Sequence, residues 1–454
     1  MENKHFTMRL TTLTPLHIGS GENRLPNIDY LIDEQAGKVY LPEPGLFFAA
    51  LEEAGILEDY IALASGWAEQ MQHAPDRERY YRASARLNVL DKVLAGKKLR
   101  QHLPPLAELS RAVLPFAQGD LPRHLRHETG DHYYQELRGH IRNLQGSYLP
   151  GSSLKGALRT ALLGKLACES PESTVAEYYK KSGKSYRKGE SPWTAAGFEK
   201  IFFGGLPYDA HPEKAIAHDP WRILQIPDLA LPRTEVYRSE MLNVRGLPAK
   251  EPWEGAFHDF GKGHWDLKQQ GRVWMEGVAA GQQVTFGMRW RGMTAQEQKN
   301  LEVQCGSSYP LRQEKQQLLQ PEQLLSHALG TTRAMLGDDL DFMDQVGVDP
   351  GKRQASDLLN RYFEKMEWLE EEAEACTPGK SAVLRLGFGS GYRFITGDWL
   401  DWKALGTRNA RALSTAVRQN DRHGRYQYIQ PAKSRRLLAD GSPLGFVKVE
   451  ILEA

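Results

Sequence analysis

The segment with the clearest chemical pattern places a glycine, two hydroxyls and two cations at the start of a predicted helix. It reads PGSSLKGALRT at 150–160. Ser152 or Ser153 can cap the helix, and the unpaired amides of a helix start favour an anionic oxygen. Lys155 and Arg159 lie four residues apart, so both project from one face of the helix. This pattern predicts a phosphate clamp, although a capped core helix with solvated cations fits the spacing equally well.

Two enzyme motifs come close to this segment. A phosphate-loop NTPase needs Gly-Lys-Ser/Thr at the end of its loop, whereas here Ala157 follows Gly156. Ser152 and Lys155 fit the Ser-x-x-Lys pattern of penicillin-binding proteins and class A β-lactamases, with Lys181-Ser182-Gly183 as a downstream triplet. The Ser-Asp-Asn element of those enzymes is missing from the sequence. A serine hydrolase therefore stays only as a rival hypothesis.

A second chemical pattern is a glycine loop that follows a predicted strand at 383–386. Its glycines alternate with other residues, as Gly387, Gly389 and Gly391. Such a loop lets backbone amides approach a ligand closely. A dinucleotide fingerprint needs a different spacing and an immediate helix, whereas 394–395 are expected to continue extended. The loop therefore predicts contact with a phosphodiester backbone, with Tyr392 stacking on a base and Arg393 pairing with a phosphate. A simple tight turn is the alternative.

A third pattern is the N-terminal loop TPLHIGSG at 14–21, which follows a predicted strand at 6–14. The loop supplies four candidate RNA-binding residues, His17, Gly19, Ser20 and Gly21. His17 could act as a general base on a ribose 2′-OH, but a loop histidine more often donates a hydrogen bond or stacks. Asp29 comes shortly after the loop and is interpreted as a turn acid before a strand.

No metal site, cofactor or catalytic residue is expected. Four histidines, at 124, 127, 132 and 140, are interpreted as part of a basic helix because no cysteine or carboxylate group accompanies them. The three cysteines lie far apart and suit a reducing compartment. The sequence carries no apolar leader at its start and no stretch of about 20 apolar residues, so we expect a cytoplasmic protein without a membrane partner.

Charge is balanced overall but segregated along the chain. The 454 residues include 58 Lys and Arg against 57 Asp and Glu, for a net charge of +1. This balance argues against a surface that is cationic everywhere, but a local basic stripe is sufficient to bind RNA. One such stretch runs from Lys403 to Arg436, with nine cations and a single acid.

Short strands separated by helical segments predict an α+β fold rather than a doubly wound parallel sheet. We expect a strand ending at Asp228, a hairpin formed by 274–278 and 283–290, helices within 321–374 and a last strand near 446–451. The expected domain organisation is as follows: core strands with the N-terminal loop at 1–45, a helical insertion at 46–146, the clamp helix and a strand at 147–235, an insertion with a hairpin and helices at 236–375, and a C-terminal segment with the glycine loop at 376–454.

Three segments together resemble one family, namely 14–21, 148–162 and 386–398, followed by PLGF at 443–446. They resemble the RAMP superfamily of CRISPR effector subunits, and their order is most similar to the fifth subunit of type III-A Csm complexes. The resemblance implies a ferredoxin-like, RRM-type core with large helical insertions. It also implies binding of CRISPR RNA near its 3′ end by a subunit that caps a filament of backbone subunits.

The resemblance further implies partners and residue roles. Lys155 and Arg159 would contact guide RNA, and the two glycine loops would line the same groove. Other Csm subunits would be direct partners, host nucleases could be recruited to trim the RNA, and target RNA would be met only indirectly. Asp29 lies where a sister subunit keeps its target-cleaving aspartate, but the fifth subunit is not usually assigned that cleavage. Alternatives are a metal-independent endoribonuclease that processes guide RNA through His17, and the equivalent subunit of a type III-B complex.

Overall fold

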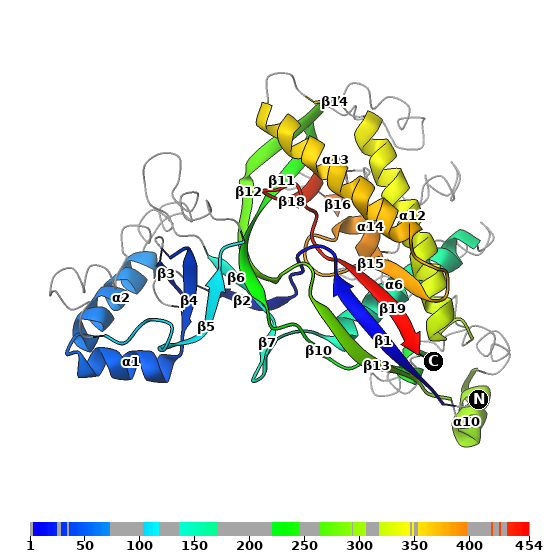
Figure 1. Cartoon of the computed structure of the whole chain (residues 1–454), viewed down its shortest axis with the longest axis horizontal. Coiled ribbons are helices and arrows are strands. Elements are labelled where there is room, and N and C mark those ends of the chain that lie inside the picture. Colours follow the sequence, from blue (N-terminus) through cyan, green and yellow to red (C-terminus); the bar gives the residue numbers. More distant parts are fainter. Residues whose placement is uncertain are drawn as a thin grey trace.

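The fold was defined by a computed structural model, shown in Figure 1. It describes residues 3–24, 29–33, 36–72, 103–117, 136–169, 220–245, 264–292, 294–305, 317–345, 347–348, 353–396, 419–420, 426–427 and 434–453. The architecture is α+β, as the sequence predicts, and consists of a large body and a small lobe.

The body is built on an antiparallel core sheet of five strands in the order β15-β19-β1-β13-β9. Its strands are β1 (Lys4–Thr12), β9 (Leu224–Gln225), β13 (Gln283–Trp290), β15 (Ser381–Arg385) and β19 (Phe446–Glu453). The helices that pack with it are α6 (Gly151–Glu169), α12 (Pro321–Gln345) and α13 (Arg353–Glu374). Along the chain, β1, α6, β9, β13, the α12–α13 pair and the β15/β19 pair follow the β-α-β-β-α-β order of a ferredoxin-like core.

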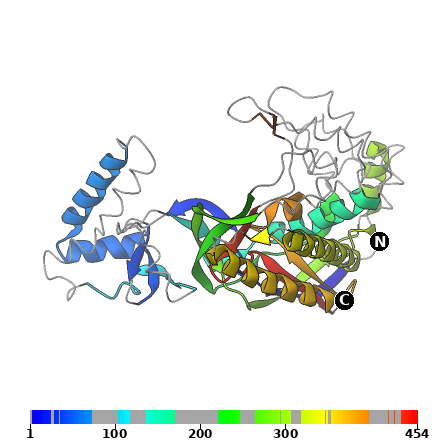
Figure 2. The same ribbon diagram turned by 90° about the horizontal axis from the view of Figure 1, so that it is seen from above.

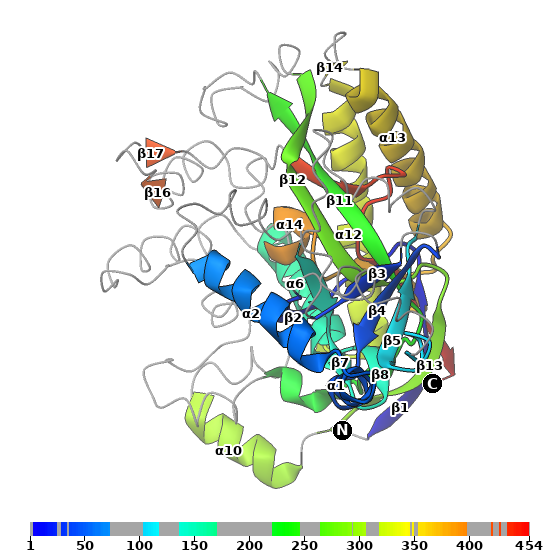
Figure 3. The same ribbon diagram turned by 90° about the vertical axis from the view of Figure 1, so that its left-hand side faces the viewer.

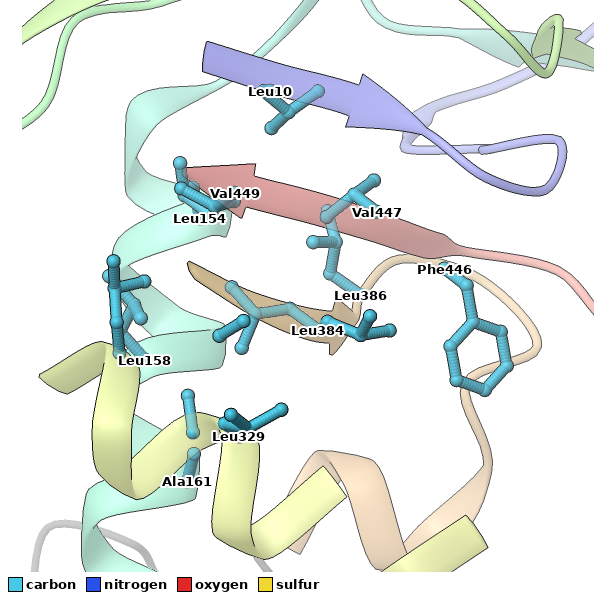
Figure 4. Packing of buried hydrophobic residues seen from close by; sticks show 14 of the residues in the cluster. Leu10, Leu154, Leu158, Ala161, Leu329, Leu384, Leu386, Phe446, Val447 and Val449 are labelled. Atoms are coloured by element: carbon cyan, nitrogen blue, oxygen red, sulfur yellow. The ribbon is translucent and has the colours of Figure 1, made fainter. Parts of the chain in front are cut away.

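Alternating burial explains how the core sheet meets its helices. In β1 the side chains of Phe6, Met8 and Leu10 are buried, while the residues between them are only half-buried. In α6 the buried Leu154 and Leu158 lie one turn apart, so they form a single apolar stripe. Figure 4 shows this stripe against the strands and α12. Each such side chain contributes about 1.5–3 kcal/mol when fully buried, so this layer supplies much of the folding energy.

A second sheet of the body carries long strands that rise beside α12 and α13 (Figure 3). Its main order is β18-β11-β12-β6-β2, and β14 pairs with β12 off this path. The strands are β2 (Gly19–Arg24), β6 (Leu137–His140), β11 (Thr234–Arg245), β12 (His264–Val278), β14 (Gly347–Val348) and β18 (Ser434–Leu438). The sheet thus contains β2, which begins within the N-terminal loop, together with β6 and the C-terminal strand β18.

The expected hairpin at 274–278 and 283–290 was wrong, because its two strands belong to different sheets. β12 pairs with β11, β6 and β14, whereas β13 pairs with β1 and β9. The connecting turn is held by β1: the amide of Gly281 donates to the Thr12 carbonyl at 2.7 Å. The Gln282 amide donates to the Thr12 hydroxyl at 2.9 Å. These contacts across the chain direct the strand after the turn into the core sheet.

The small lobe contains strands as well as helices and stands apart from the helices of the body (Figure 2). It consists of β3 (Leu31–Asp33), β4 (Lys38–Pro42), α1 (Pro44–Glu53), α2 (Leu57–Gln72) and β5 (Ser110–Pro115). Phe47, Leu51 and Ile56 are central to its apolar cluster. The expectation of a wholly helical segment at 46–146 was therefore wrong, because this segment also provides β5, whose backbone pairs with β4, and β6, whose backbone pairs with β12.

Short elements complete the described fold. They are β7 (Arg142–Asn143), β8 (Gly146–Leu149), the 3-10 helix at Pro220–Ile223, β10 (Leu229–Ala230), α10 (Ala295–Cys305), α14 (Gly391–Thr396), β16 (Gln419–Asn420) and β17 (Tyr426–Gln427). The expected strand ending at Asp228 is replaced by the 3-10 turn and two short strands that flank Asp228. The Lys181-Ser182-Gly183 triplet and most of the basic stretch from Lys403 to Arg436 lie outside the described residues.

Among the residues described, no helix is long and apolar enough to cross a membrane. The same residues hold no group of three or more His, Cys, Asp or Glu side chains placed to bind a metal ion.

Candidate nucleic-acid interface

The two glycine loops predicted from the sequence meet in the structure. The amide of Phe388, in the C-terminal loop, donates to the carbonyl of His17, in the N-terminal loop, at 2.9 Å. The PLGF segment closes the arrangement, because Gly445 donates to Pro15 and accepts from Leu386, both at 2.9 Å. Three segments that lie far apart in the sequence therefore form one backbone junction.

Two glycines in this junction leave no room for a side chain. Gly387 has a φ of 80°, and a Cβ there would lie 2.6 Å from the His17 carbonyl oxygen. Gly445 has a φ of 89°, and its Cβ would overlap the Leu386 carbonyl oxygen. Because L-residues disfavour this left-handed region, only glycine fits both the conformation and the space.

Arg385 holds the C-terminal glycine loop from beneath. Its guanidinium donates to the carbonyls of Leu444 and Gly389, each at 3.0 Å. It also lies over the rings of Phe394 and Phe446, 5.3 Å and 4.7 Å from their centroids. Burial lowers the pKa of Arg385. The side chain is therefore a fixed internal support rather than a group that reaches solvent.

The extended segment expected at 394–395 was wrong, because the chain turns into α14 at Gly391. Phe394 packs edge-on against Phe446 with ring centroids 5.7 Å apart, which directs this turn of helix toward the core. Tyr392 and Arg393 belong to α14, but their side chains are not described. Their contacts with RNA stay a prediction.

A buried charge cluster ties the N-terminal loop to β12. Glu276 is fully buried and accepts from Arg24 at 2.6 Å and from the Nε of Arg142 at 2.7 Å. A second nitrogen of Arg142 also pairs with this carboxylate. Burial alone raises the pKa of Glu276, but the charges and hydrogen bonds of Arg142 and Arg24 outweigh it and hold the pKa below its ordinary value. Two guanidiniums thus share one buried carboxylate.

Two buried histidines complete this cluster. Nδ1 of His17 lies 2.6 Å from the Glu276 carbonyl oxygen and must donate to it. Nδ1 of His140 accepts from the Ile18 amide at 3.1 Å, so its Nε2 donates to the Tyr148 carbonyl at 3.0 Å. Burial lowers the pKa of both rings, that of His140 to about 4. Both histidines are neutral and structural at neutral pH.

This neutral His140 predicts a loss of stability in mild acid. The unfolded chain protonates the imidazole below pH 6.5, whereas the folded chain resists protonation until about pH 4. The contribution is therefore complete above pH 6.5 and is lost as the pH falls toward 4, by roughly 3 kcal/mol. Urea unfolding between pH 7.5 and 4.5 should show a shallower decline for His140→Gln than for the parent chain. The matched variant at the exposed His5 should follow the parent, and equal slopes for all three proteins would contradict the prediction.

The predicted N-terminal site residues divide into a buried and an accessible group. His17 is only 2% exposed, so its ring supports the loop from inside. Gly19 and Gly21 are exposed in β2, and the half-buried Ser20 donates to the Gly139 carbonyl at 3.1 Å. Asp29 is exposed beside Tyr60 of the small lobe, where burial and then the Asp29 charge raise the pKa of Tyr60 to about 12.

The start of α6 is occupied by partners from the chain itself. The Gly151 amide donates to the Asp228 carboxylate at 2.9 Å, and Lys155 donates to the Leu224 carbonyl at 2.8 Å. Leu224 pairs with Trp290 in the core sheet, and Trp290 also pairs with Lys4. Lys4 is the first residue of β1, at the opposite end of that strand from the N-terminal loop. The structure therefore joins the two glycine loops but does not bring the Lys155 ammonium to them.

The remaining predicted residues of α6 lie in its first turns. Ser152 is exposed, while Ser153 and Arg159 are half-buried. RNA contact by these residues and by Lys155 stays a prediction.

Sequence reasoning missed Arg138 and Arg436, whose guanidiniums both lie near the ring of Phe388 in the C-terminal loop. Their guanidinium carbons lie 4.9 Å and 5.3 Å from the Phe388 ring centroid. Arg436 ends the basic stretch noted in the sequence, which was the available signal. Arg138 lies in the short strand β6, and no local sequence pattern predicts that it is close to Phe388.

Comparisons with known proteins show what the chain is similar to. Residues 9–217 match the model of the RAMP superfamily. A Streptococcus thermophilus protein, named CRISPR system Cms protein Csm5, is 28% identical over 181 residues, which are 39% of this chain and 44% of that relative. The match thus spans less than half of the relative.

Two solved structures share the fold over nearly the whole chain. A chain of the cryo-EM structure of a Csm–crRNA–target RNA ternary complex of a type III-A CRISPR-Cas system superposes with a TM-score of 0.60 and 18% identity, covering 98% of this chain and 100% of that one. The crystal structure of T. onnurineus Csm5 gives 0.55 and 17%, covering 97% and 99%. Residues 9–217 of the chain are therefore similar to the RAMP superfamily, and the chain as a whole shares the fold of these two solved structures.

Proposed function

We propose that the chain binds CRISPR RNA as the Csm5-like subunit of a type III-A Csm complex. In this role it caps the filament of backbone subunits near the 3′ end of the guide and assists maturation of that end. The observation that carries the proposal is the junction of the two glycine loops beside two arginines. Contacts of this kind recognise the charge and shape of the RNA backbone rather than the base sequence.

The proposed partners follow from this role. Guide RNA is the ligand, other Csm subunits are the neighbours, target RNA is met through the guide, and host nucleases trim the exposed 3′ end. The support is the full-length fold shared with a chain of a Csm–crRNA–target RNA complex. The proposed location is the cytoplasm, where such RNA is made.

We infer that the chain itself does not cleave RNA. A general base must reach the ribose hydroxyl within hydrogen-bonding distance, whereas His17 is 2% exposed and its Nδ1 is engaged with Glu276. Labelled guide RNA incubated with the pure protein in EDTA should therefore stay intact. Cleavage that disappears in His17→Ala would establish the endoribonuclease alternative instead.

The salt dependence of RNA binding tests the proposed function and the clamp on α6. Each phosphate neutralised on a single strand contributes about −0.7 to the slope of log affinity against log salt. Lys155→Ala with Arg159→Ala should weaken binding of a labelled single-stranded RNA and flatten the slope by up to about 1.4.

The matched control replaces Lys38 and Lys380, two exposed cations that lie in β4 of the small lobe and just before β15. An unchanged slope for Lys155→Ala with Arg159→Ala, accompanied by a lower melting temperature, would assign Lys155 to the support of β9 and remove the clamp. A parent chain that binds no single-stranded RNA would overturn the proposed function itself.

A further inference from the structure

We propose that Arg138 and Asn23 bind one RNA phosphodiester at the β2 edge of the second sheet, beside the C-terminal glycine loop. We call these two residues the edge pair. The inference rests on the proposed RNA-binding function and names one contact within it. Arg138 supplies the charge that pairs with the phosphate, and Asn23 supplies a neutral amide donor next to it.

The edge pair consists of cross-strand neighbours on one face of the sheet. Asn23 in β2 is paired with Arg138 in β6, and β2 is the last strand in the order of that sheet. Side chains of directly opposed residues point to the same face, with their Cβ atoms about 4.5–5.5 Å apart. A ligand at this edge can therefore touch both side chains at once.

Arg138 lies where the two glycine loops meet. β2 begins within the N-terminal loop, and its glycines Gly19 and Gly21 are exposed. The register between β2 and β6 shifts between Gly19 and Asn23, so this exposed stretch lies directly before the residue that pairs with Arg138. The guanidinium carbon of Arg138 lies 4.9 Å from the ring centroid of Phe388 in the C-terminal loop. Arg138 therefore connects both loops.

The charge of Arg138 is half-buried and has no acidic partner. Within the residues that the structure describes, its guanidinium takes part in no ion pair and no hydrogen bond. The Glu22 carboxylate of β2 lies 4.0 Å from Arg24 instead. Burial of a charge is unfavourable unless an opposite charge compensates it, and stacking on an aromatic ring offsets only part of that cost. An anionic ligand supplies the missing compensation.

Both members of the edge pair can reach a ligand. Asn23 is exposed, and none of the guanidinium nitrogens of Arg138 is a buried atom that lacks a hydrogen-bond partner. Since these nitrogens form no hydrogen bond in the described part of the chain, they keep surface that solvent can reach. The fork of a guanidinium matches two oxygens of one phosphate. A phosphodiester presents such oxygens along RNA without regard to base sequence.

Substitutions separate the charged contact from the neutral one. Arg138→Gln should weaken binding of a labelled oligouridine to the full-length chain roughly tenfold and flatten the slope of log affinity against log salt by about 0.7. Asn23→Ala should weaken binding only about threefold and leave the slope unchanged, because no charge is removed.

Asn23→Asp is the sharpest test of the edge pair, because it keeps the size of the side chain and places a carboxylate opposite Arg138. The new carboxylate should pair with the guanidinium and exclude the phosphate. Binding should therefore weaken at least as much as in Arg138→Gln, and the slope should flatten by a similar amount. The matched control is Asn360→Asp, which adds the same charge at an exposed asparagine of α13 and should change neither quantity.

Two further variants complete the experiment. Arg138→Lys should keep most of the slope but lose part of the affinity, since an ammonium lacks the fork, and Lys380→Gln should change neither. Unchanged binding in Arg138→Gln or in Asn23→Asp would overturn the edge pair. A weaker affinity with an unchanged slope in Arg138→Gln would also overturn it, because Arg138 would then only support Phe388. In each case the parent chain still binds RNA, whereas a parent that binds none would overturn the proposed function as well.

Discussion

Glu276→Gln is expected to destabilise the chain by about 3–5 kcal/mol. The side chain keeps its size but loses the charge that compensates Arg24 and Arg142, two guanidiniums of which the first is only 5% exposed. Removing one partner of a buried ion pair leaves the other charges desolvated and unpaired, which costs more than the pair contributes when it is intact. Urea or thermal unfolding of the purified chain measures the loss.

Glu22→Gln is the matched control for this experiment. The Glu22 carboxylate lies 4.0 Å from the same Arg24 but is 66% exposed, so its removal should change stability by less than about 0.5 kcal/mol. The low pKa of Glu276 also fixes the pH response: its contribution is present above the ordinary carboxyl range and is lost as the pH falls through the lowered value. Glu276→Gln should therefore lack part of the acid-induced loss, and a loss below about 1 kcal/mol at neutral pH would contradict the role given to Glu276.

Gly445→Ala is expected to cost more than about 4 kcal/mol, in the range reserved for severe structural conflicts. The substitution combines a left-handed backbone with a Cβ that overlaps the Leu386 carbonyl oxygen, so the junction between PLGF and the glycine loop must open. We expect a poorly folded or strongly destabilised protein, measured by its unfolding midpoint and its near-UV circular dichroism.

Gly281→Ala separates the two causes. Gly281 has a φ of 77°, similar to the 89° of Gly445, but a Cβ there would meet nothing within 4 Å. Its replacement should cost only the conformational term of about 1–2 kcal/mol. If both alanine variants lost the same free energy of unfolding, the overlap of a Cβ at Gly445 with the Leu386 carbonyl oxygen would contribute nothing to the cost.

The elements with a regular local period are those that the sequence predicts well. The alternation in β1, the leucine stripe of α6 and the long helices between 321 and 374 all appear close to their expected bounds. Local spacing is sufficient there because the apolar face of each element is set by residues near one another in the chain.

Pairings that depend on distant residues were not accessible in the same way. The hairpin prediction failed because the turn at Gly281 and Gln282 forms hydrogen bonds with Thr12, about 270 residues away in the sequence. Glu276 pairs with Arg24 and Arg142, which are 252 and 134 residues away in the sequence, so no local sequence pattern predicts the cluster.

Part of the candidate site could nevertheless be predicted. Alternating glycines and a loop histidine marked the two loops, and the structure joins them through His17 and Phe388. The two arginines near the Phe388 ring come from separate strands, and only the folded sheet brings them together.

The position of β19 has a consequence for how the protein is made. β19 lies between β15 and β1 in the core sheet, and its first residue, Phe446, donates its amide to the Thr14 hydroxyl. A ribosome releases β1 hundreds of residues before either neighbour, so β1 lacks both strand partners until β13 emerges and lacks one of them until β19 emerges. The contacts of Phe446 with Leu13 and Thr14, just before the N-terminal loop, form only when residue 446 emerges. A chain that stops before residue 446 therefore lacks the hydrogen bond from Phe446 to Thr14 and the pairing of β19 with β1.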